Sequence, residues 1–493
     1  MGEGAWEAAD DGAVRRLGQL SPARRALAER LLAERAAARA AGPVRRASAD
    51  LAAPLSFQQA RVWERERVGH RSTSLIPSTL RLAADVDVDA MERAWRGLGE
   101  RHRALRTVFG AGGEQRPDGP ELGFERLDLT GTPPDRVDDE VERHADLLVE
   151  EPMDLAAGPP VRARLLRLGP GDHALLIAAH HLVTDAWSQL VCFRELRALY
   201  RDAAAGTAGG LPEPPLQYAD YAAWQRQAAA AGRFDAQLDH WARALAGAPP
   251  LLDLPAVAAA RPGDEGLRLG VLDLDVAAPH ADALREIGRR AGASSFMTLL
   301  AAFAAVLGAA AGQDEVVVGT PAAGRTRAEL EQVIGFFANP LPLRVRVDRA
   351  EAFPDLLARV RGVAAEAFAR QDVPLDLVLR RLDLPPAPGR APLFQAAFVL
   401  QNVGERGARQ AGAGLDRRAG RPALYPFLPF YSPAAAAFDV GVQLIDRGGA
   451  LAGNLEYDAG RVPDEVAGAL RERLLDLLAR VAERPEVPLG RVL

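Results

Sequence analysis

Short apolar runs alternate with helical patterns along most of the chain. Residues 75–82 have the composition of a strand, residues 88–98 carry an apolar stripe at helical spacing, and residues 105–109 turn apolar again. The second half repeats this order, with a strand, two helices and another strand predicted at residues 267–274, 281–290, 294–307 and 315–319. The pattern predicts an α/β (α+β) protein whose two halves resemble each other.

A stretch rich in alanine, proline and glycine separates these halves. Residues 246–266 break both periodicities, so we expect an inter-lobe linker there. The first lobe then occupies residues 51–245 and the second residues 267–493. Residues 405–435 have no clear period, which is typical of a lid or a crossing loop.

The first 50 residues are rich in alanine, arginine and glutamate. Ser21 and Pro22 have the pattern of a helix start, an N-cap followed by proline at the first helical position. We therefore expect residues 1–50 to form a helical lead-in or linker without activity of its own.

Length and charge narrow the class of protein. A chain of 493 residues exceeds what one hydrophobic core usually serves, so two lobes are expected. The net charge of -6 is spread without long blocks, and no apolar run approaches the roughly 18 residues that a membrane span needs, so we expect neither nucleic acid nor membrane as partner. Cys192 is the one cysteine, and no secretory signal is visible, so we expect a cytoplasmic protein. We also expect a monomer.

Lysine is absent from the sequence, and all 60 basic residues are arginine. A phosphate-binding loop needs its lysine on the phosphates, and Schiff-base chemistry needs a lysine amine. Both reaction classes are therefore excluded, and the residues present indicate no intrinsic cofactor or metal.

The candidate chemistry lies where a buried strand is predicted to end. Residues 174–179 form a continuous apolar run that is followed directly by His180 and His181. Asp185 comes four residues later, and an apolar stripe at helical spacing continues from there to Tyr200. Two histidines at the end of a strand and an aspartate at a helix start thus lie on one short loop.

Neighbouring side chains of a strand point to opposite sides, so only one imidazole can face a given pocket. Such a ring can accept a proton from an attacking amine or hydroxyl, or donate a hydrogen bond to a tetrahedral intermediate. Asp185 is expected to orient the loop, either through hydrogen bonds or while held by an arginine. The residues fit acyl transfer without a covalent enzyme intermediate.

The same residues allow other interpretations. A buried histidine pair with satisfied hydrogen bonds stays open, whereas a metal site is disfavoured because adjacent strand residues do not easily reach one ion. A serine hydrolase would need a Gly-x-Ser-x-Gly turn, which does not occur. Cys192 lies on the apolar stripe of its helix and is interpreted as a core residue.

The segment from His180 to Ser188 resembles the His-His-x-x-x-Asp-Gly motif of nonribosomal peptide synthetase condensation domains, which belong to the chloramphenicol acetyltransferase-like superfamily. Further segments agree with this family in order, at residues 56–63, 101–109, 218–224, 319–325, 334–339, 370–375 and 392–402. The resemblance spans roughly residues 20–490. The chain departs from the family at Ala186, where glycine is usual, and at Pro340, where threonine is usual.

The resemblance implies two chloramphenicol acetyltransferase-like lobes in a V-shaped pseudo-dimer, with a tunnel open at both ends. Donor and acceptor peptidyl carrier proteins would deliver substrates on their phosphopantetheine arms, and an amide bond would form between them. Adjacent synthetase domains, with an adenylation domain downstream, would be further partners in antibiotic biosynthesis. Residues 405–435 would cross between the lobes, and residues 334–343 would line the floor of the tunnel.

The resemblance also assigns roles to single residues. His181 would be the catalytic imidazole, with His180 and Asp185 beside it in the motif. We expect Arg325 to be the ionic partner of Asp185, with Arg344 as second choice. Arg61 and Arg106 are expected to support the site. The expected tunnel residues are Ala186, Trp187, Ser188, Asn339 and Gln401.

Two alternatives to an amide-forming enzyme remain at this point. One is a noncatalytic recruitment module of the same fold that docks a partner protein. The other is an acyltransferase of the same superfamily that forms esters or uses free substrates.

Overall fold

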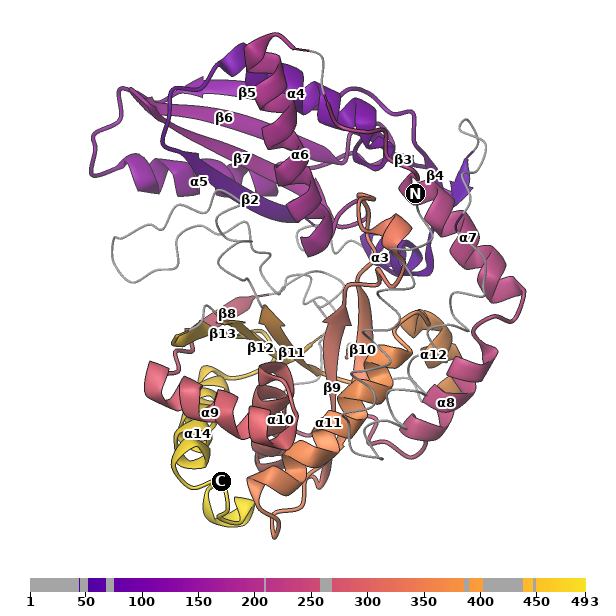
Figure 1. Cartoon of the computed structure of the whole chain (residues 1–493), viewed down its shortest axis with the longest axis vertical. Helices are drawn as coiled ribbons and strands as arrows, with labels where there is room; N and C mark the ends of the chain where they lie inside the picture. Colours follow the sequence, from indigo (N-terminus) through magenta and orange to yellow (C-terminus); the bar gives the residue numbers. More distant parts are fainter. Residues whose placement is uncertain are drawn as a thin grey trace, which may run out of the picture.

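The structure is a computed structural model, and its fold is formed by two lobes, each built around one larger β-sheet (Figure 1). The described residues are Val44 and residues 52–67, 75–207, 210–257, 268–384, 390–401, 438–446 and 449–493. Most of the predicted lead-in and all of residues 405–435 therefore lie outside the described residues.

The first lobe contains a four-stranded sheet in the order β2-β7-β6-β5. Only β5 and β6 run parallel, and the other neighbours are antiparallel. Its strands are β2 (Leu75–Leu82), β5 (Gly123–Asp128), β6 (Val161–Gly169) and β7 (Asp172–His180). Eight of the nine residues of β7 are buried, as its apolar run predicts for a strand covered on both faces.

Helices cover both faces of this sheet. On one face α4 (Val88–Arg101) and α6 (Ala186–Ala205) pack together over it. On the other face α5 (Val137–Glu150) buries its apolar side against alternate residues of β6 and β7. This two-sided cover fixes where β7 ends, and therefore where the histidine pair lies.

Smaller elements complete the first lobe. Helix α3 (Phe57–Arg67) lies beside a three-stranded sheet in the order β1-β4-β3, and a 3-10 helix (Arg103–Arg106) follows α4. The strands of this sheet are β1 (Ala53–Pro54), β3 (Val108–Phe109) and β4 (Glu114–Arg116). In the predicted strand at residues 105–109, the first two residues thus belong to the 3-10 helix and only the last two form a strand.

The second lobe contains a six-stranded sheet in the order β10-β9-β11-β12-β13-β8. Strand β11 runs parallel to both of its neighbours, and the other pairs are antiparallel. Its strands are β8 (Leu269–Asp273), β9 (Glu315–Ala322), β10 (Asn339–Arg346), β11 (Ala396–Gln401), β12 (Val440–Asp446) and β13 (Leu451–Asp458). The strands predicted at 267–274 and 315–319 correspond to β8 and β9.

The main helices of the second lobe cover the sheet face that points away from the first lobe (Figure 1). Ser294 caps α10 by accepting a hydrogen bond from the Met297 backbone N–H at 3.3 Å, and 11 of the 17 residues of α10 are buried. The helices are α9 (Ala278–Ala291), α10 (Ser295–Ala311), α11 (Phe353–Ala369), α12 (Leu375–Leu382) and α14 (Asp464–Glu483), with 3-10 turns at Ala328–Leu330 and Leu489–Arg491. The predicted mixture of helix and sheet is confirmed.

Two segments connect the lobes, and each of them packs side chains into the core of the opposite lobe. Helices α7 (Tyr218–Ala230) and α8 (Asp235–Leu245) run down one side of the molecule (Figure 1), and Trp241 of α8 is buried in the core of the second lobe. In return, residues 323–338 leave the second lobe and bury Phe336 and Phe337 in the core of the first. We call residues 323–338 the connecting segment.

Within the described ranges, no single helix is long and apolar enough to cross a bilayer. The pair α9 and α10 meets the length and composition criteria together but is bent by 104°.

Gly335 lies where the connecting segment meets the ring of Tyr218. A Cβ atom at this position would lie 1.9 Å from Cδ2 of Tyr218, so the ring or the backbone must move. We expect Gly335→Ala to lower the free energy of unfolding by about 1–3 kcal/mol, measured by urea denaturation. The matched control is Gly362→Ala, because Gly362 lies in α11 with nothing within 4 Å of an added Cβ. The control should raise stability by about 0.5–1 kcal/mol, and equal effects at both sites would contradict the packing argument.

Candidate active site

His181 follows the last residue of β7, on the tight loop that leads to α6. Its Nδ1 lies 2.9 Å from the backbone oxygen of Thr184. A carbonyl oxygen only accepts, so this contact places the proton on Nδ1 and leaves a lone pair on Nε2. The Nε2 atom is buried and has no hydrogen-bond partner among the residues that the structure describes.

The surroundings of the His181 ring are apolar. The side chain is 3% exposed, and the ring of Phe336 lies 4.7 Å away between centroids. Burial lowers the pKa of His181 to about 4, against the opposing effects of the Thr184 hydrogen bond and the Asp185 charge. The imidazole is therefore neutral at pH 7, with an unshared electron pair on Nε2.

His180 is oriented toward different neighbours. Its Nδ1 accepts a hydrogen bond from the Leu182 backbone N–H at 3.1 Å, and its Nε2 lies 3.4 Å from Oε1 of Glu66 on α3. The two rings thus have separate environments, as the alternation of a strand predicts. Glu66 was missed by the sequence analysis. It shares one face of α3 with Gln59 and the fully buried Val62, and that helical spacing was the available signal.

Asp185 is the N-cap of α6, and its carboxylate is held on all sides. Oδ1 accepts a hydrogen bond from the Ser188 backbone N–H at 2.8 Å, and Oδ2 accepts one from the Phe337 backbone N–H at 2.9 Å. Arg325 Nη1 lies 2.9 Å from Oδ2. Because these partners occupy both oxygens, Asp185 positions the loop and has no free lone pair aimed at a substrate.

Arg325 is the predicted ionic partner of Asp185, and the structure contains this ion pair. The Arg325 side chain is 1% exposed, and its Nη2 also donates to Ser188 Oγ at 2.7 Å and to the Val333 backbone oxygen at 3.1 Å. Its guanidinium carbon lies 4.0 Å from the ring centroid of Phe337. Arg344, the second choice, pairs instead with Glu315 at 2.6 Å in the second lobe.

Ser188 joins α6 to the connecting segment. Its Oγ donates to the Gly335 backbone oxygen at 2.6 Å and accepts from the Gly335 N–H at 3.0 Å. Nearby, the Tyr218 hydroxyl donates to the backbone oxygen of Phe336 and contacts Ser56 Oγ at 2.8 Å. Ser188, which was expected to line a tunnel, thus helps to hold the backbone around His181 in place.

The other expected supporting residues are more scattered. Arg106 donates to the Gly119 backbone oxygen at 2.8 Å, within the first lobe. Arg61 extends from α3, and its Nε and Nη2 are buried without a hydrogen-bond partner among the described residues. No contact between either arginine and the His181 loop appears among the described interactions.

The remaining expected tunnel residues lie in three places. Ala186 and Trp187 are exposed at the start of α6, and Trp187 Nε1 donates to the Glu331 backbone oxygen at 2.9 Å. Asn339 is buried, and its amide bonds the backbone of Gln371, Val373 and Leu375, at 3.0, 2.7 and 3.0 Å. Gln401 is the last residue of β11, whereas Asn339 is the first residue of β10.

Pro340, one of the two departures from the family motif, has a structural explanation. It lies in β10, which is an edge strand of the six-stranded sheet and pairs only with β9. An edge strand tolerates proline because its outer backbone needs no donor.

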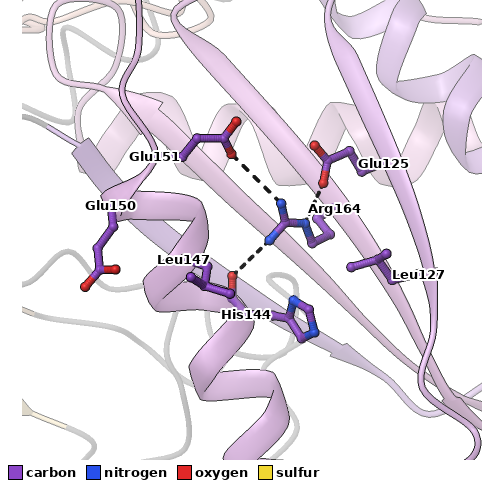
Figure 2. Close-up of a pocket in the computed structure, with 7 residues that line it drawn as sticks. All are labelled: Glu125, Leu127, His144, Leu147, Glu150, Glu151 and Arg164. Atoms are coloured by element: carbon purple, nitrogen blue, oxygen red, sulfur yellow. Dashed lines mark hydrogen bonds and ion pairs between the residues drawn. The ribbon is translucent and has the colours of Figure 1, made fainter.

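A separate pocket of about 530 Å³ lies on the α5 face of the first sheet (Figure 2). Arg164 is at its floor, bound to Glu125 at 2.6 Å and within 4.0 Å of Glu151. Arg164 pairs with Leu176 of β7 on the face that α5 covers, whereas His181 packs against Phe336. The size of a pocket therefore does not identify the candidate active site in this protein.

Among the described residues, no group of three metal-binding side chains forms.

Comparison with known proteins gives one consistent family. A family model described as "Condensation domain" matches residues 50–493. The chain is 38% identical to phosphinothricin tripeptide synthetase PhsC of Streptomyces viridochromogenes over 490 residues, which covers 95% of this chain and 43% of that protein. It is 35% identical to malpinin synthetase of Mortierella alpina over 435 residues, covering 87% of this chain and 5% of that protein. The chain thus spans less than half the length of these relatives.

Solved structures agree with this comparison. The X-domain from teicoplanin biosynthesis superposes with a TM-score of 0.77 at 27% identity, covering 92% of this chain and 99% of that one. The complex of that X-domain with OxyB gives a TM-score of 0.75 at 25% identity, covering 92% and 98%.

Removal of either partner of the buried ion pair leaves the other charge without compensation. We expect Arg325→Ala and Asp185→Ala each to lower the free energy of unfolding by about 3–5 kcal/mol. Arg289→Ala is the matched control, because its pair with Glu286 is exposed and exposed pairs contribute at most about 1 kcal/mol. Urea denaturation of the three variants tests this, and a loss at Arg325 no larger than at Arg289 would refute the structural role.

The lowered pKa of His181 makes stability depend on pH. The unfolded ring takes up a proton below its ordinary value of 6.5, whereas the folded ring stays neutral down to about pH 4. The stabilisation is therefore complete above pH 6.5 and is lost as the pH falls toward 4. Between pH 7.5 and 5, wild type should lose about 2 kcal/mol more than His181→Gln, which cannot titrate. Parallel pH profiles in urea denaturation would show that the ring is not buried in its neutral form.

Proposed function

Because the chain belongs to the condensation domain family, we propose that it catalyses amide bond formation between a carrier-bound acyl or peptidyl donor and a carrier-bound aminoacyl acceptor. Members of this family serve in nonribosomal peptide synthetases, and peptide bond formation is their general role. The proposal for this chain assigns the central step to His181.

The observation that carries this proposal is the state of the His181 ring. A neutral imidazole with its Nδ1 proton fixed on Thr184 and a bare Nε2 is a base with a single orientation. Because Thr184 adjoins the N-cap Asp185, the same loop that binds the ring is held by Arg325. A base that is already oriented avoids the cost of ordering during the reaction.

In the proposed step, the acceptor amine attacks the carbonyl carbon of the donor thioester, and the new carbon–nitrogen bond forms. Nε2 of His181 accepts the proton that the amine loses. Collapse of the tetrahedral intermediate breaks the carbon–sulfur bond, and the proton passes to the departing thiolate. The products are an amide on the acceptor carrier and a free phosphopantetheine thiol on the donor carrier.

The substrates would be tethered, which supplies part of the rate. Two arms that enter from opposite sides convert a bimolecular reaction into a local one. We propose donor and acceptor peptidyl carrier proteins as partners, phosphopantetheine as their arm rather than as a cofactor of this chain, and a cytoplasmic location. An adenylation domain downstream, the lobe boundary at residues 246–266 and a monomeric state belong to the same proposal.

A noncatalytic recruitment module is the second candidate. The observation that favours it is the similarity to the X-domain, which forms a complex with OxyB. The 3% exposure of His181 also fits this candidate, because a substrate has little access to the ring in this structure. In this case the fold would dock a protein partner and form no product from any pair of loaded carriers.

The catalytic proposal is tested by removing the imidazole. We expect His181→Ala to reduce the rate of product formation by about 10²–10⁴-fold, because a positioned acid–base group contributes that much. Loaded donor and acceptor carriers are incubated with the protein, and the product is measured by intact-protein mass spectrometry in single turnover.

His173→Ala is the matched control for this experiment. His173 is a buried imidazole on β7, the strand that precedes His181, and its Nδ1 lies 3.2 Å from the Ala84 backbone oxygen, away from the loop. It should keep the wild-type rate per folded molecule. A wild-type rate in His181→Ala would reject the catalytic role, and absence of product with wild type under all pairs would favour the recruitment module.

A further inference from the structure

The two adjacent imidazoles carry their protons on opposite nitrogens. Nδ1 of His181 faces the Thr184 backbone oxygen at 2.9 Å and therefore keeps its proton. Nδ1 of His180 instead accepts from the Leu182 backbone N–H at 3.1 Å, so the proton of this ring lies on Nε2. The backbone of one short loop thus requires a different tautomer of each ring.

Glu66 of α3 is the acidic residue beside Nε2 of His180. Its Oε1 lies 3.4 Å from Nε2, and the side chains of His180 and Glu66 are 3% and 11% exposed. The distance is longer than that of an ordinary hydrogen bond, so the contact is mainly electrostatic. It still discriminates between the tautomers, because a protonated Nε2 turns a positive hydrogen toward the carboxylate, whereas a bare Nε2 would turn a lone pair toward it.

The peptide group that His180 holds is the one that follows His181. The Leu182 N–H belongs to the bond between these two residues, so its direction fixes the backbone ψ angle of His181. The Leu182 backbone oxygen accepts a hydrogen bond from Gln59 Nε2 at 2.8 Å. Gln59 and Glu66 are seven residues apart on α3, two turns along one face. Helix α3 therefore supports the loop at Leu182, in addition to the ion pair that holds the N-cap of α6.

We propose that Glu66 is a positioning residue of the proposed reaction, which keeps the proton of His180 on Nε2 so that Nδ1 can hold the peptide after His181. Glu66 acts on the reaction through His180 alone. Without the carboxylate, the buried Nε2–H loses its nearest acceptor, and a proton that moves to Nδ1 opposes the Leu182 N–H. This inference rests on the proposed function, because it takes Nε2 of His181 to be the base.

The experiment compares Glu66→Leu and Glu66→Gln with wild type in single turnover with loaded carriers. Leucine has a similar volume to glutamate but no acceptor, whereas the glutamine amide can turn its oxygen toward Nε2 of His180. The matched control is Glu64→Leu, because Glu64 is an exposed carboxylate on the same helix. Urea denaturation of each variant gives the folded fraction to which the rate is normalised.

We expect Glu66→Leu to lower the maximal rate about 10–100-fold, because a small displacement of a reacting group costs that much. The substrate concentration at half-maximal rate should change by less than about twofold, since no substrate contact is removed. Glu66→Gln should retain at least about a third of the rate, because an acceptor remains, and Glu64→Leu should match wild type. A wild-type rate in Glu66→Leu, or an equally deep loss in Glu66→Gln, would overturn the proposal.

His180→Asn tests whether Glu66 acts through the ring. The asparagine oxygen can replace Nδ1 as the acceptor for the Leu182 N–H, but no group then faces Glu66. Adding Glu66→Leu to His180→Asn should therefore lower the rate by less than about twofold more. Fully additive losses would mean that the carboxylate acts by another route, which contradicts the positioning role.

The ring tautomers give a readout that needs no activity. In protein with isotope-labelled histidine, the nitrogen shifts distinguish a protonated Nε2 from a protonated Nδ1, and the signals of His180 are those that His180→Asn removes. Wild type should show the proton on Nε2, and Glu66→Leu should show it shared with Nδ1. An unchanged tautomer in Glu66→Leu would reject the inference. If wild type forms no product from any pair of carriers, the proposed catalysis fails, and the tautomer of His180 in Glu66→Leu still decides whether Glu66 sets its proton.

Discussion

The buried ion pair between Asp185 and Arg325 is the interaction on which the rest of the site depends. It joins a helix N-cap in the first lobe to a segment that comes from the second, with both side chains almost fully buried. A desolvated pair of this kind is stabilising only when further hydrogen bonds satisfy both groups. Ser188, Phe337 and Val333 provide those bonds, so the loop that carries His181 has one well-determined conformation.

Around this pair the two lobes share their cores rather than merely touching. Phe336 and Phe337 lie in the first core and Trp241 in the second, each delivered by a segment from the opposite lobe. Phe336 also contacts the His181 ring, so the apolar environment that keeps this imidazole neutral is made by both lobes. The chemistry of a residue in one lobe is therefore set partly by the folding of the other.

The sequence predicted the local parts of this arrangement well, because they follow from periodicity and caps. The buried strand that ends at His180 and the helix that begins after Asp185 were both predictable. Arg325 was found through the family motif and not from spacing. Glu66 and the true role of Ser188 were missed, because their partners lie more than 100 residues away and only tertiary packing brings them together. Asn339 likewise bonds backbone groups that no periodic pattern could reveal.

The connecting segment also has a consequence for the evolution and engineering of this protein. Residues 323–338 belong to the second lobe by chain order but complete the hydrophobic interior of the first. Consider a chimaera in which one lobe of this chain is joined at residues 246–266 to the other lobe of a relative. Tyr218 and Ser188 would then pack against the backbone of a different protein at the position of Gly335. Successful recombination must therefore keep residues 323–338 together with α6 and α7 of the same parent protein. Whether two lobes fit each other depends on these contacting segments and not on the linker.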